Sequence, residues 1–240
     1  MALCLLMLSA CLFGGGGKDE DDTGSDGSSG DGGTITPDPP GPGVLLYVGD
    51  GGGGPGTDLY PTEVEALFAD AGIAVLLSET LPADWVESYG VLVLLNPTSA
   101  LSAEVTSGAA ALLDRGGRLV IGFEREGWGN TAAHNELLVA VGSTMRTVSA
   151  QSSGGEAHLS VQDVGGLTAG VSSLLTFYSA SVDLGEGDAV SVGEADGTTV
   201  VGYEAVGRGD VVIVADSSFF GYALDEADNA RFIENFASLR

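Results

Sequence analysis

The stretch Leu113-Asp-Arg-Gly-Gly-Arg-Leu-Val-Ile-Gly122 decides the fold class, because it joins the end of a helix to a buried strand. Gly116-Gly117 closes the helix, since glycine readily adopts the left-handed conformation found just after a helix C-terminus. Leu119 to Ile121 is a run of large aliphatic residues, which is typical of a strand covered on both faces. The stretch therefore predicts a helix packed against a sheet.

The same alternation of strands and helices extends to both sides of this stretch. Thr57 or Asp58 is expected to cap a helix that has Pro61 in its first turn and ends at Gly72. Ser102 is expected to start the helix that Gly116 closes. Aliphatic runs predict buried strands over 44–48, 91–95 and 211–214 and a further strand over 73–77. Helices are also predicted over 134–141 and 227–239.

The second half of the chain differs, because its predicted strands are short and follow one another directly. These strands cover 158–161, 174–178, 189–192 and 199–204, and Asp196-Gly197 is a strong hairpin signal between the last two. The whole pattern predicts one α/β domain over 44–240, with a mainly parallel sheet and an antiparallel insertion in its second half.

The N-terminus carries a different signal. Leu8-Ser-Ala-Cys11 lies in an uncharged apolar run, Met1 to Phe13, and resembles the lipobox of bacterial lipoproteins. A membrane-spanning helix needs roughly 20 apolar residues, and this run stops at Gly14. The resemblance implies a signal peptide over residues 1–10 and a lipid on Cys11. It places the protein in the cell envelope, attached to a membrane through the lipid and facing the periplasm or the exterior.

Residues 11–43 are expected to form a tether. Gly14 to Gly43 is rich in Gly, Ser, Asp and Pro, a composition that favours an extended disordered segment because it cannot bury a core. The alternative is a calcium-binding loop over Asp19 to Asp31. That segment lacks the Asp-x-Asp-x-Asp-Gly frame with a distal Glu, which argues against specific calcium binding.

Composition excludes several classes of function. The chain has 34 acidic and 8 basic residues and a formal net charge of −26, which makes nucleic acid an unsuitable partner. The same charge repels an anionic membrane surface, so attachment should depend on the lipid. Cys4 and Cys11 are the only cysteines, and the expected processing leaves no thiol for a disulfide, a thiolate metal site or a cysteine nucleophile.

Three stretches carry a resemblance to the class I glutamine amidotransferase-like, flavodoxin-like superfamily. They are 113–122 quoted above, Asn135-Glu-Leu-Leu-Val-Ala-Val-Gly142, and Gly207-Arg-Gly-Asp-Val-Val-Ile-Val-Ala-Asp216 followed by Asp228-Asn-Ala230. The chain is more similar to the non-catalytic extracytoplasmic branch, which includes soluble parts of gliding-motility-type ABC transport components. The resemblance implies a flavodoxin-like layered fold and does not by itself confer a function.

The catalytic members of that superfamily use a Cys in a strand-to-helix elbow with a distal His. Here the turn after the 119–121 strand reads Gly122-Phe-Glu-Arg-Glu-Gly-Trp128 and contains no cysteine. A serine elbow of the form Gly-x-Ser-x-Gly is also absent from the sequence. His134 and His158 are expected to be surface or cap residues. Amidotransferase and Ser–His hydrolase activities are therefore disfavoured, and no cofactor is predicted.

Oxygen-bearing side chains follow the predicted strands at Asp50, Asn96, Glu124 and Asp216. The carboxyl ends of parallel strands meet at one edge of a sheet, so these side chains should converge there. They suit a hard cation or the hydroxyls of a sugar, and Trp128 and Tyr222 could supply a stacking face. The alternative interpretation is that Asp and Asn at these positions cap turns and helices. The glycine-rich turn after Asp50 has acidic flanks, which repel phosphate and disfavour nucleotide binding.

The leading hypothesis is a lipid-anchored, non-enzymatic binding or scaffold domain that recognises a protein or glycan partner. One alternative is a metal-assisted hydrolase that uses Asp50, Glu124 and Asp216 on a sugar or an ester. A second alternative, an accessory component of an ABC-type transporter, follows only from the resemblance.

Overall fold

The computed structural model describes residues 41–52, 59–125, 127–152 and 154–239. All of them belong to the second of the two units of the chain, Pro37–Arg240. The predicted signal peptide, Cys11, residues 12–40 of the predicted tether and the candidate caps Thr57 and Asp58 lie outside the described residues. Gly43, the last residue of the predicted tether, is the first residue of β1. Within those residues, no helix combines the length and the apolar character needed to span a bilayer.

The described residues form strands and helices in the alternation that the sequence predicts. The strands are β1 (Gly43–Tyr47), β2 (Val75–Ser78), β3 (Tyr89–Leu95), β4 (Arg118–Gly122), β5 (Arg146–Val148), β6 (Glu156–Val161), β7 (Leu174–Phe177), β8 (Ser181–Asp183), β9 (Val190–Ala195), β10 (Thr198–Val206) and β11 (Gly209–Val214). The α-helices are α1 (Pro61–Asp70), α2 (Trp85–Ser88), α3 (Ala103–Asp114), α4 (Thr131–Ala140) and α5 (Asn229–Glu234). The 3₁₀ helices are η1 (Gly165–Thr168), η2 (Ser217–Phe220) and η3 (Asn235–Ala237).

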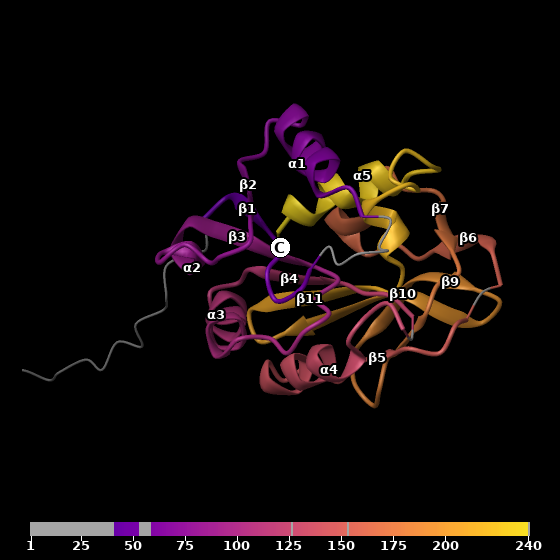
Figure 1. Cartoon of the computed structure of the whole chain (residues 1–240). Helices are drawn as coiled ribbons and strands as arrows, with labels where there is room; N and C mark the ends of the chain where they lie inside the picture. Colours follow the sequence, from indigo (N-terminus) through magenta and orange to yellow (C-terminus); the bar gives the residue numbers. More distant parts are fainter. Residues whose placement is uncertain (1–40, 53–58, 126, 153, 240) are drawn as a thin grey trace, which may run out of the picture. The chain divides into compact units, whose positions relative to one another are not determined.

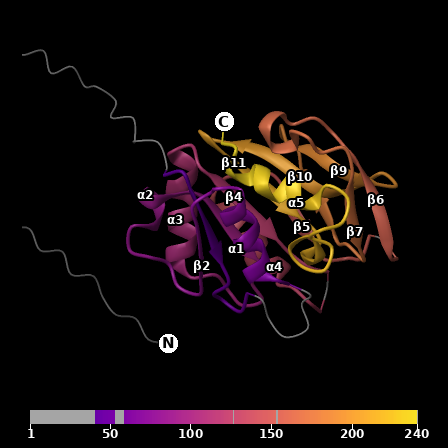
Figure 2. The same cartoon turned by 90° about the horizontal axis from the view of Figure 1, so that it is seen from above.

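One large sheet runs through the domain in the order β2-β1-β3-β4-β11-β10-β9-β6-β7. Its first five strands are parallel. The aliphatic runs of β1, β3, β4 and β11 are buried because helices cover both faces, whereas the edge strand β2 is half-buried. Figures 1 and 2 show α1 and α5 on one face of these strands, with α3 and α4 on the other. The predicted α/β class is confirmed.

The antiparallel strands were only partly anticipated. Strands β6 to β10 do lie between β4 and β11 in sequence, and Asp196-Gly197 does form the turn between β9 and β10, with φ of 51° and 78°. However, β10, β9, β6 and β7 extend the parallel sheet directly, so only its first half is parallel. The prediction of a mainly parallel sheet is wrong to that extent, because alternation along the chain does not reveal which strand each hairpin joins.

The antiparallel half curls so that the end of β7 returns to the end of β11. The amide of Ala180 donates to the carbonyl of Ala215 at 2.8 Å. Phe177 N and Thr176 Oγ1 both donate to Oδ2 of Asp216, the first at 2.7 Å. These bonds join strands that stand four places apart in the sheet order. The curl therefore brings the carboxyl end of β7 to the carboxyl end of the parallel strands.

Side-chain caps set the starts of α3 and α4. Ser102 accepts from the amide of Val105 at 3.2 Å and starts α3 as predicted. Helix α1 begins at Pro61 with Tyr60 at the N-cap position and no side-chain cap, so the prediction of Thr57 or Asp58 as its cap is wrong. Helix α4 begins at Thr131, earlier than predicted, because the Asn130 side chain caps it. The predicted closing helix over 227–239 is shorter and divides into α5 and η3.

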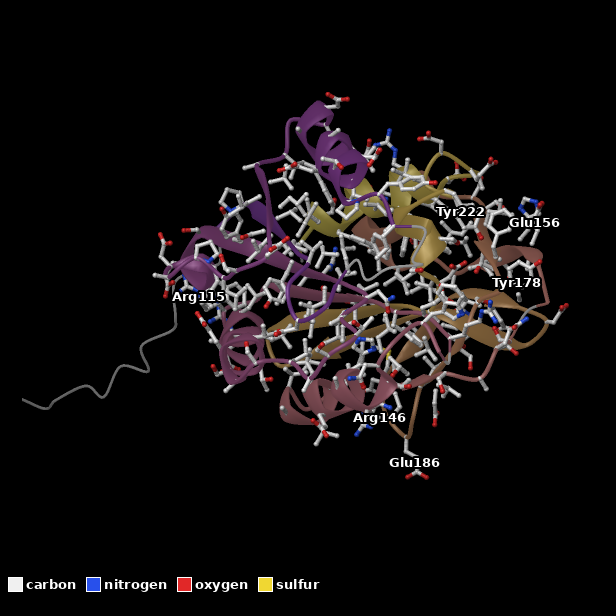
Figure 3. All side chains as sticks on the ribbon, in the orientation of Figure 1. Arg115, Arg146, Glu156, Tyr178, Glu186 and Tyr222 are labelled. Atoms are coloured by element: carbon white, nitrogen blue, oxygen red, sulfur yellow. The ribbon has the colours of Figure 1, made fainter. Side chains whose placement is uncertain are left out.

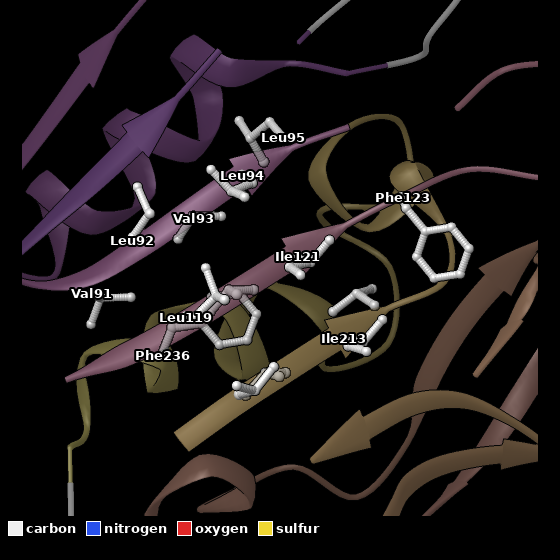
Figure 4. Close-up of a cluster of buried hydrophobic side chains, with 14 of the residues drawn as sticks. Val91, Leu92, Val93, Leu94, Leu95, Leu119, Ile121, Phe123, Ile213 and Phe236 are labelled. Atoms are coloured by element: carbon white, nitrogen blue, oxygen red, sulfur yellow. The ribbon is translucent and has the colours of Figure 1, made fainter. Parts of the chain in front are cut away.

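The core lies on both faces of the central strands. Figure 4 shows side chains of β3 and β4, with Ile213 of β11, beside Phe236 of the closing segment. Phe232, Ile233 and Phe236 of that segment are fully buried. Phe232 and Phe236 pack edge to face with ring centroids 5.2 Å apart. The closing segment thus completes one face of the core.

A buried ion pair lies at the amino-terminal ends of the parallel strands, where β4 and β11 begin. Nε and Nη2 of Arg118 donate to the two carboxylate oxygens of Asp210 at 2.5 and 3.0 Å, and both side chains are 2% exposed. Nη1 donates to the carbonyls of Asn235 and Phe236 at 3.1 and 2.9 Å. Arg118 therefore joins the two strands to the closing segment.

Removing one partner of this pair leaves a buried charge without compensation. We expect Arg118→Met to lower the free energy of unfolding by about 3–5 kcal/mol. Urea denaturation followed by circular dichroism measures this loss. The double variant Arg118→Met, Asp210→Leu should regain most of it, because no charge remains buried. A loss below about 1 kcal/mol in the single variant would contradict the assignment.

Candidate functional site

The carboxyl ends of β1, β3, β4 and β11 lie at one edge of the sheet, and the four predicted polar residues follow them. The structure separates these residues by role. Asp50 and Asn96 organise the loops after β1 and β3. Glu124 and Asp216 lie close together after β4 and β11, which are paired in parallel.

Asp50 connects two loops. Its carboxylate accepts from Tyr47 Oη at 3.1 Å and from the amide of Ser102 at 3.3 Å, and its carbonyl accepts from the amide of Ser99 at 2.9 Å. Burial, followed by the hydrogen bond to Asp50, raises the pKa of Tyr47 to about 12. Asp50 has a φ of 53°, a left-handed conformation that Asp tolerates better than most residues. The turn interpretation therefore accounts for Asp50.

Asn96 is fully buried, with a φ of 48°. Its Nδ2 donates to the carbonyl of Trp128 at 2.9 Å, which holds the loop after β4 against the end of β3. Its Oδ1 makes no hydrogen bond with any other described group. Asn96 therefore positions Trp128 and is not itself accessible to a ligand.

Glu124 and Asp216 form the acidic pair of the edge. Ser217 Oγ donates to Oε2 of Glu124 at 2.7 Å, and the amide of Arg125 donates to Oε1 at 2.9 Å. Burial raises the pKa of Glu124 despite these bonds, and the neighbouring Asp216 carboxylate raises it further. The side chain of Glu124 is 14% exposed, so a ligand at the edge could reach it.

Asp216 has a structural role instead. It is fully buried, and it accepts from the amide of Ser218 at 2.8 Å as well as from Thr176 and Phe177. Burial raises its pKa, although these hydrogen bonds oppose the shift. The bonds from Thr176 and Phe177 hold the curled sheet together, and the bond from Ser218 caps η2.

The described residues contain no group of three or more His, Cys, Asp or Glu side chains that could hold a metal ion. Asp50, Glu124 and Asp216, which the metal-assisted hydrolase would use, are not arranged as such a group.

Exposed aromatic side chains gather at this same edge. Among the described residues, the exposed Phe, Tyr and Trp side chains are Tyr60, Trp128, Tyr178 and Tyr222, each between 40% and 47% exposed. They lie before α1, after β4, after β7 and after η2, all at the carboxyl edge of the parallel strands. Figure 3 shows Tyr178 and Tyr222 on the side of the domain away from Arg115, which ends α3. We call these four residues the aromatic edge.

Contacts connect the members of the aromatic edge. The guanidinium of Arg125 lies 5.7 Å from the ring centroid of Tyr178, and the amide of Trp128 donates to the carbonyl of Arg125 at 3.1 Å. The rings of Phe177 and Tyr222 are 5.0 Å apart. The amide of Tyr60 donates to the carbonyl of Phe220, close to Tyr222 in the chain, at 2.8 Å.

Sequence reasoning placed Trp128 and Tyr222 at this edge because both follow predicted parallel strands. It missed Tyr60, Arg125 and Tyr178. Tyr178 is the last residue of the predicted 174–178 strand, whereas β7 ends at Phe177. The direction of this strand depends on the curled antiparallel half, which has no local sequence signal.

His134 corrects another prediction. It was expected at the surface or in a cap, whereas it is fully buried in α4 and packs edge to face on Phe123 at 5.9 Å. Burial lowers its pKa to about 4, although the carbonyl of Pro97 opposes the shift. The exposed His158 is consistent with the prediction.

Fold and site together define a mixed α/β domain that presents an aromatic edge beside a partly buried carboxylate. The chain belongs to the family described as domain of unknown function DUF4350, whose model matches residues 63–237. No curated protein matches the chain significantly.

Solved structures share the fold at low sequence identity. The mmIFT52 N-terminal domain has a TM-score of 0.60 and 10% identity over 80% of this chain and 93% of its own. The cytoplasmic protein STM1381 from Salmonella typhimurium LT2 has a TM-score of 0.56 and 12% identity over 81% and 98%. A β-galactosidase from Bacillus circulans has a TM-score of 0.53 and 17% identity over 82% of this chain but 31% of its own. These likenesses concern the fold alone.

The buried His134 generates a prediction about pH. Its pKa is lower in the folded protein than its ordinary value of 6.5, so the unfolded chain binds the proton more readily. This contribution to stability is complete above pH 6.5 and is lost as the pH falls towards 4. It amounts to about 3 kcal/mol.

We therefore expect the fall in the free energy of unfolding between pH 7 and pH 4 to be about 3 kcal/mol smaller in His134→Leu than in the parent. Urea denaturation at both pH values measures the difference. Glu124 and Asp216, whose pKa values are raised, have the opposite pH dependence, but they are present in both proteins and cancel in the comparison. Equal losses in the two proteins would show that folding does not lower the pKa of His134.

Proposed function

We propose that the chain is a bacterial lipoprotein whose folded domain is a non-catalytic binding module, held at the cell envelope through Cys11 and recognising a protein or glycan partner through the aromatic edge. The lipobox-like Leu8-Ser-Ala-Cys11 supports the anchor. The carboxyl edge of the sheet supports the binding role. Attachment to the membrane would come from the lipid and partner recognition from the domain.

The observation that carries this proposal is the position of the four exposed aromatic side chains. The other aromatic residues of the described part are buried or half-buried, and all of the exposed ones belong to loops at one edge. Exposed rings grouped in this way are typical of interaction sites, since Trp and Tyr supply much of the binding energy in interfaces.

The neighbouring polar groups suit recognition more than catalysis. Glu124 is engaged by Ser217 and by the amide of Arg125, which fixes its orientation for accepting a hydrogen bond from a ligand. Ser217 is 2% exposed, so it is poorly placed as a nucleophile. Aromatic faces beside fixed carboxylates fit either the hydroxyls and apolar face of a sugar or a protein surface.

The assignment of the fold as flavodoxin-like is also part of this proposal. The order β2-β1-β3-β4, with all four strands parallel, is the order of flavodoxin-like sheets. It supports a flavodoxin-like, amidotransferase-like ancestry without the catalytic cysteine. In such sheets ligands bind at the carboxyl edge, which is where the aromatic edge lies.

The anchor can be tested with the two cysteines of the chain. Cys11→Ser should move the protein from the membrane fraction to the soluble fraction of the producing bacterium, because the lipid is lost. Cys4→Ser is the matched control and should leave the distribution unchanged. Fractionation and immunoblotting provide the readout, and a Cys11→Ser protein that stays in the membrane would refute lipid anchoring at this residue.

The binding role can be tested on the aromatic edge. The variant Trp128→Ala, Tyr222→Ala should weaken capture of the membrane or cell-wall partner by about tenfold or more, because buried aromatic anchors dominate binding energy. Affinity capture followed by mass spectrometry and glycan-array binding measure the loss. Val139→Ser, which changes a 61% exposed apolar residue of α4, is the control. Unchanged capture by the aromatic variant would argue against this surface.

A further inference from the structure

A pocket of about 300 Å³ lies at one end of the aromatic edge. Helix α1 forms one wall with Glu63, Ala66, Leu67 and Asp70, whose spacing places them on one face of the helix. The segment 221–225 after η2 forms the other wall. Tyr60 and Tyr222 contribute rings from the two sides, so the pocket is continuous with the aromatic edge.

The lining of this pocket is acidic and aromatic. Glu63, Asp70 and Asp225 are exposed carboxylates, and none of the described residues that line the pocket is basic. Carboxylates beside aromatic faces complement a cation, since the ring face and the oxygens both attract positive charge. Anions and nucleotides would be repelled, both here and by the net charge of −26.

The volume limits the size of the bound group. Pockets that enclose whole small molecules have volumes of roughly 300–1,000 Å³, so this one lies at the lower limit. It has room for one side chain presented by a larger partner. Among cationic side chains, arginine fits best, because its planar guanidinium can stack on a ring and donate paired hydrogen bonds to carboxylates.

The aromatic edge already contains this arrangement within the chain. Arg125 lies over the ring of Tyr178 at 5.7 Å, with Nε 4.0 Å from Oε1 of Glu124. A guanidinium between a tyrosine ring and a carboxylate is therefore compatible with the chemistry of this edge. The pocket offers the same two components, and the described residues place no guanidinium among its lining.

We infer that the pocket between α1 and residues 221–225 binds an arginine side chain of a basic segment on a partner protein. This inference rests on the proposed binding function and specifies the partner: a protein with an exposed arginine, which also covers the aromatic edge. The acidic domain would attract such a segment at long range, and the pocket would select its guanidinium.

The test is an NMR titration of the ¹⁵N-labelled full chain with the end-blocked peptide Gly-Gly-Arg-Gly-Gly. The expected result is saturable shifts at the amides of Tyr60, Glu63 and 221–225. The same peptide with citrulline, which is neutral and nearly isosteric, should bind at least about fivefold more weakly, because it lacks the charge. Equal binding of the two peptides, or no shifts at millimolar peptide, would overturn the inference.

A pair of matched variants separates the pocket from the general acidity of the chain. Glu63→Gln, Asp225→Asn should weaken arginine-peptide binding about five- to tenfold. Glu186→Gln, Asp188→Asn removes the same charge from exposed residues between β8 and β9, and Figure 3 shows Glu186 far from Tyr222. This control should change binding less than about twofold. Equal weakening by both pairs would overturn the inference in favour of non-specific attraction.

Capture experiments distinguish this inference from the proposed function. A partner whose capture is lost in Trp128→Ala, Tyr222→Ala and also in Glu63→Gln, Asp225→Asn supports both. A partner, such as a neutral glycan, whose capture needs the aromatic residues but not the two carboxylates would overturn the arginine pocket and leave the binding module standing. Thermal unfolding of each variant verifies that the exposed substitutions preserve the fold.

Discussion

The pairing of Arg118 with Asp210 is the constraint on which the rest of the structure depends. A buried charge costs several kcal/mol unless it is fully compensated, and Arg118 is compensated only when β4, β11 and the carbonyls of Asn235 and Phe236 are all in place. Arg118 is one of only 8 basic residues in the chain, against 34 acidic ones. This one contact fixes two central strands and the closing segment together.

The aromatic edge follows from that arrangement. Once β4 and β11 are neighbours, Glu124 and Asp216 emerge side by side, and Asp216 can accept from Thr176 and Phe177 at the end of the curled sheet. This brings Tyr178 to the side that already holds Trp128 and Tyr222. Asp216, which sequence reasoning selected as a ligand-binding residue, is therefore a buried structural carboxylate. Tyr60 and Tyr178, which sequence reasoning missed, belong to the accessible surface.

The parts that could be predicted are those with local physical causes. Aliphatic runs identified the strands, Ser102 the start of α3, and Asp196-Gly197 the hairpin, because each depends on neighbours in the chain. The burial of His134, the position of Tyr178 and the continuation of the sheet beyond β11 depend on contacts between distant segments. Asp50 and Asn96 were placed correctly after their strands, but their left-handed backbone and loop contacts, which sequence spacing does not report, give them structural roles.

The insertion of β6 to β10 between β4 and β11 also makes the central pairing of these two strands a long-range contact. Strand β4 has its partner β3 nearby in the chain, yet its other edge stays open until the entire antiparallel half has been made and β11 arrives. Pairings over such sequence separations form slowly, because the loop entropy is lost before the contact is gained. Until then the unpaired aliphatic edge of β4 can pair with other chains and cause aggregation. Low protein concentration and binding by chaperones should therefore raise the yield of native protein.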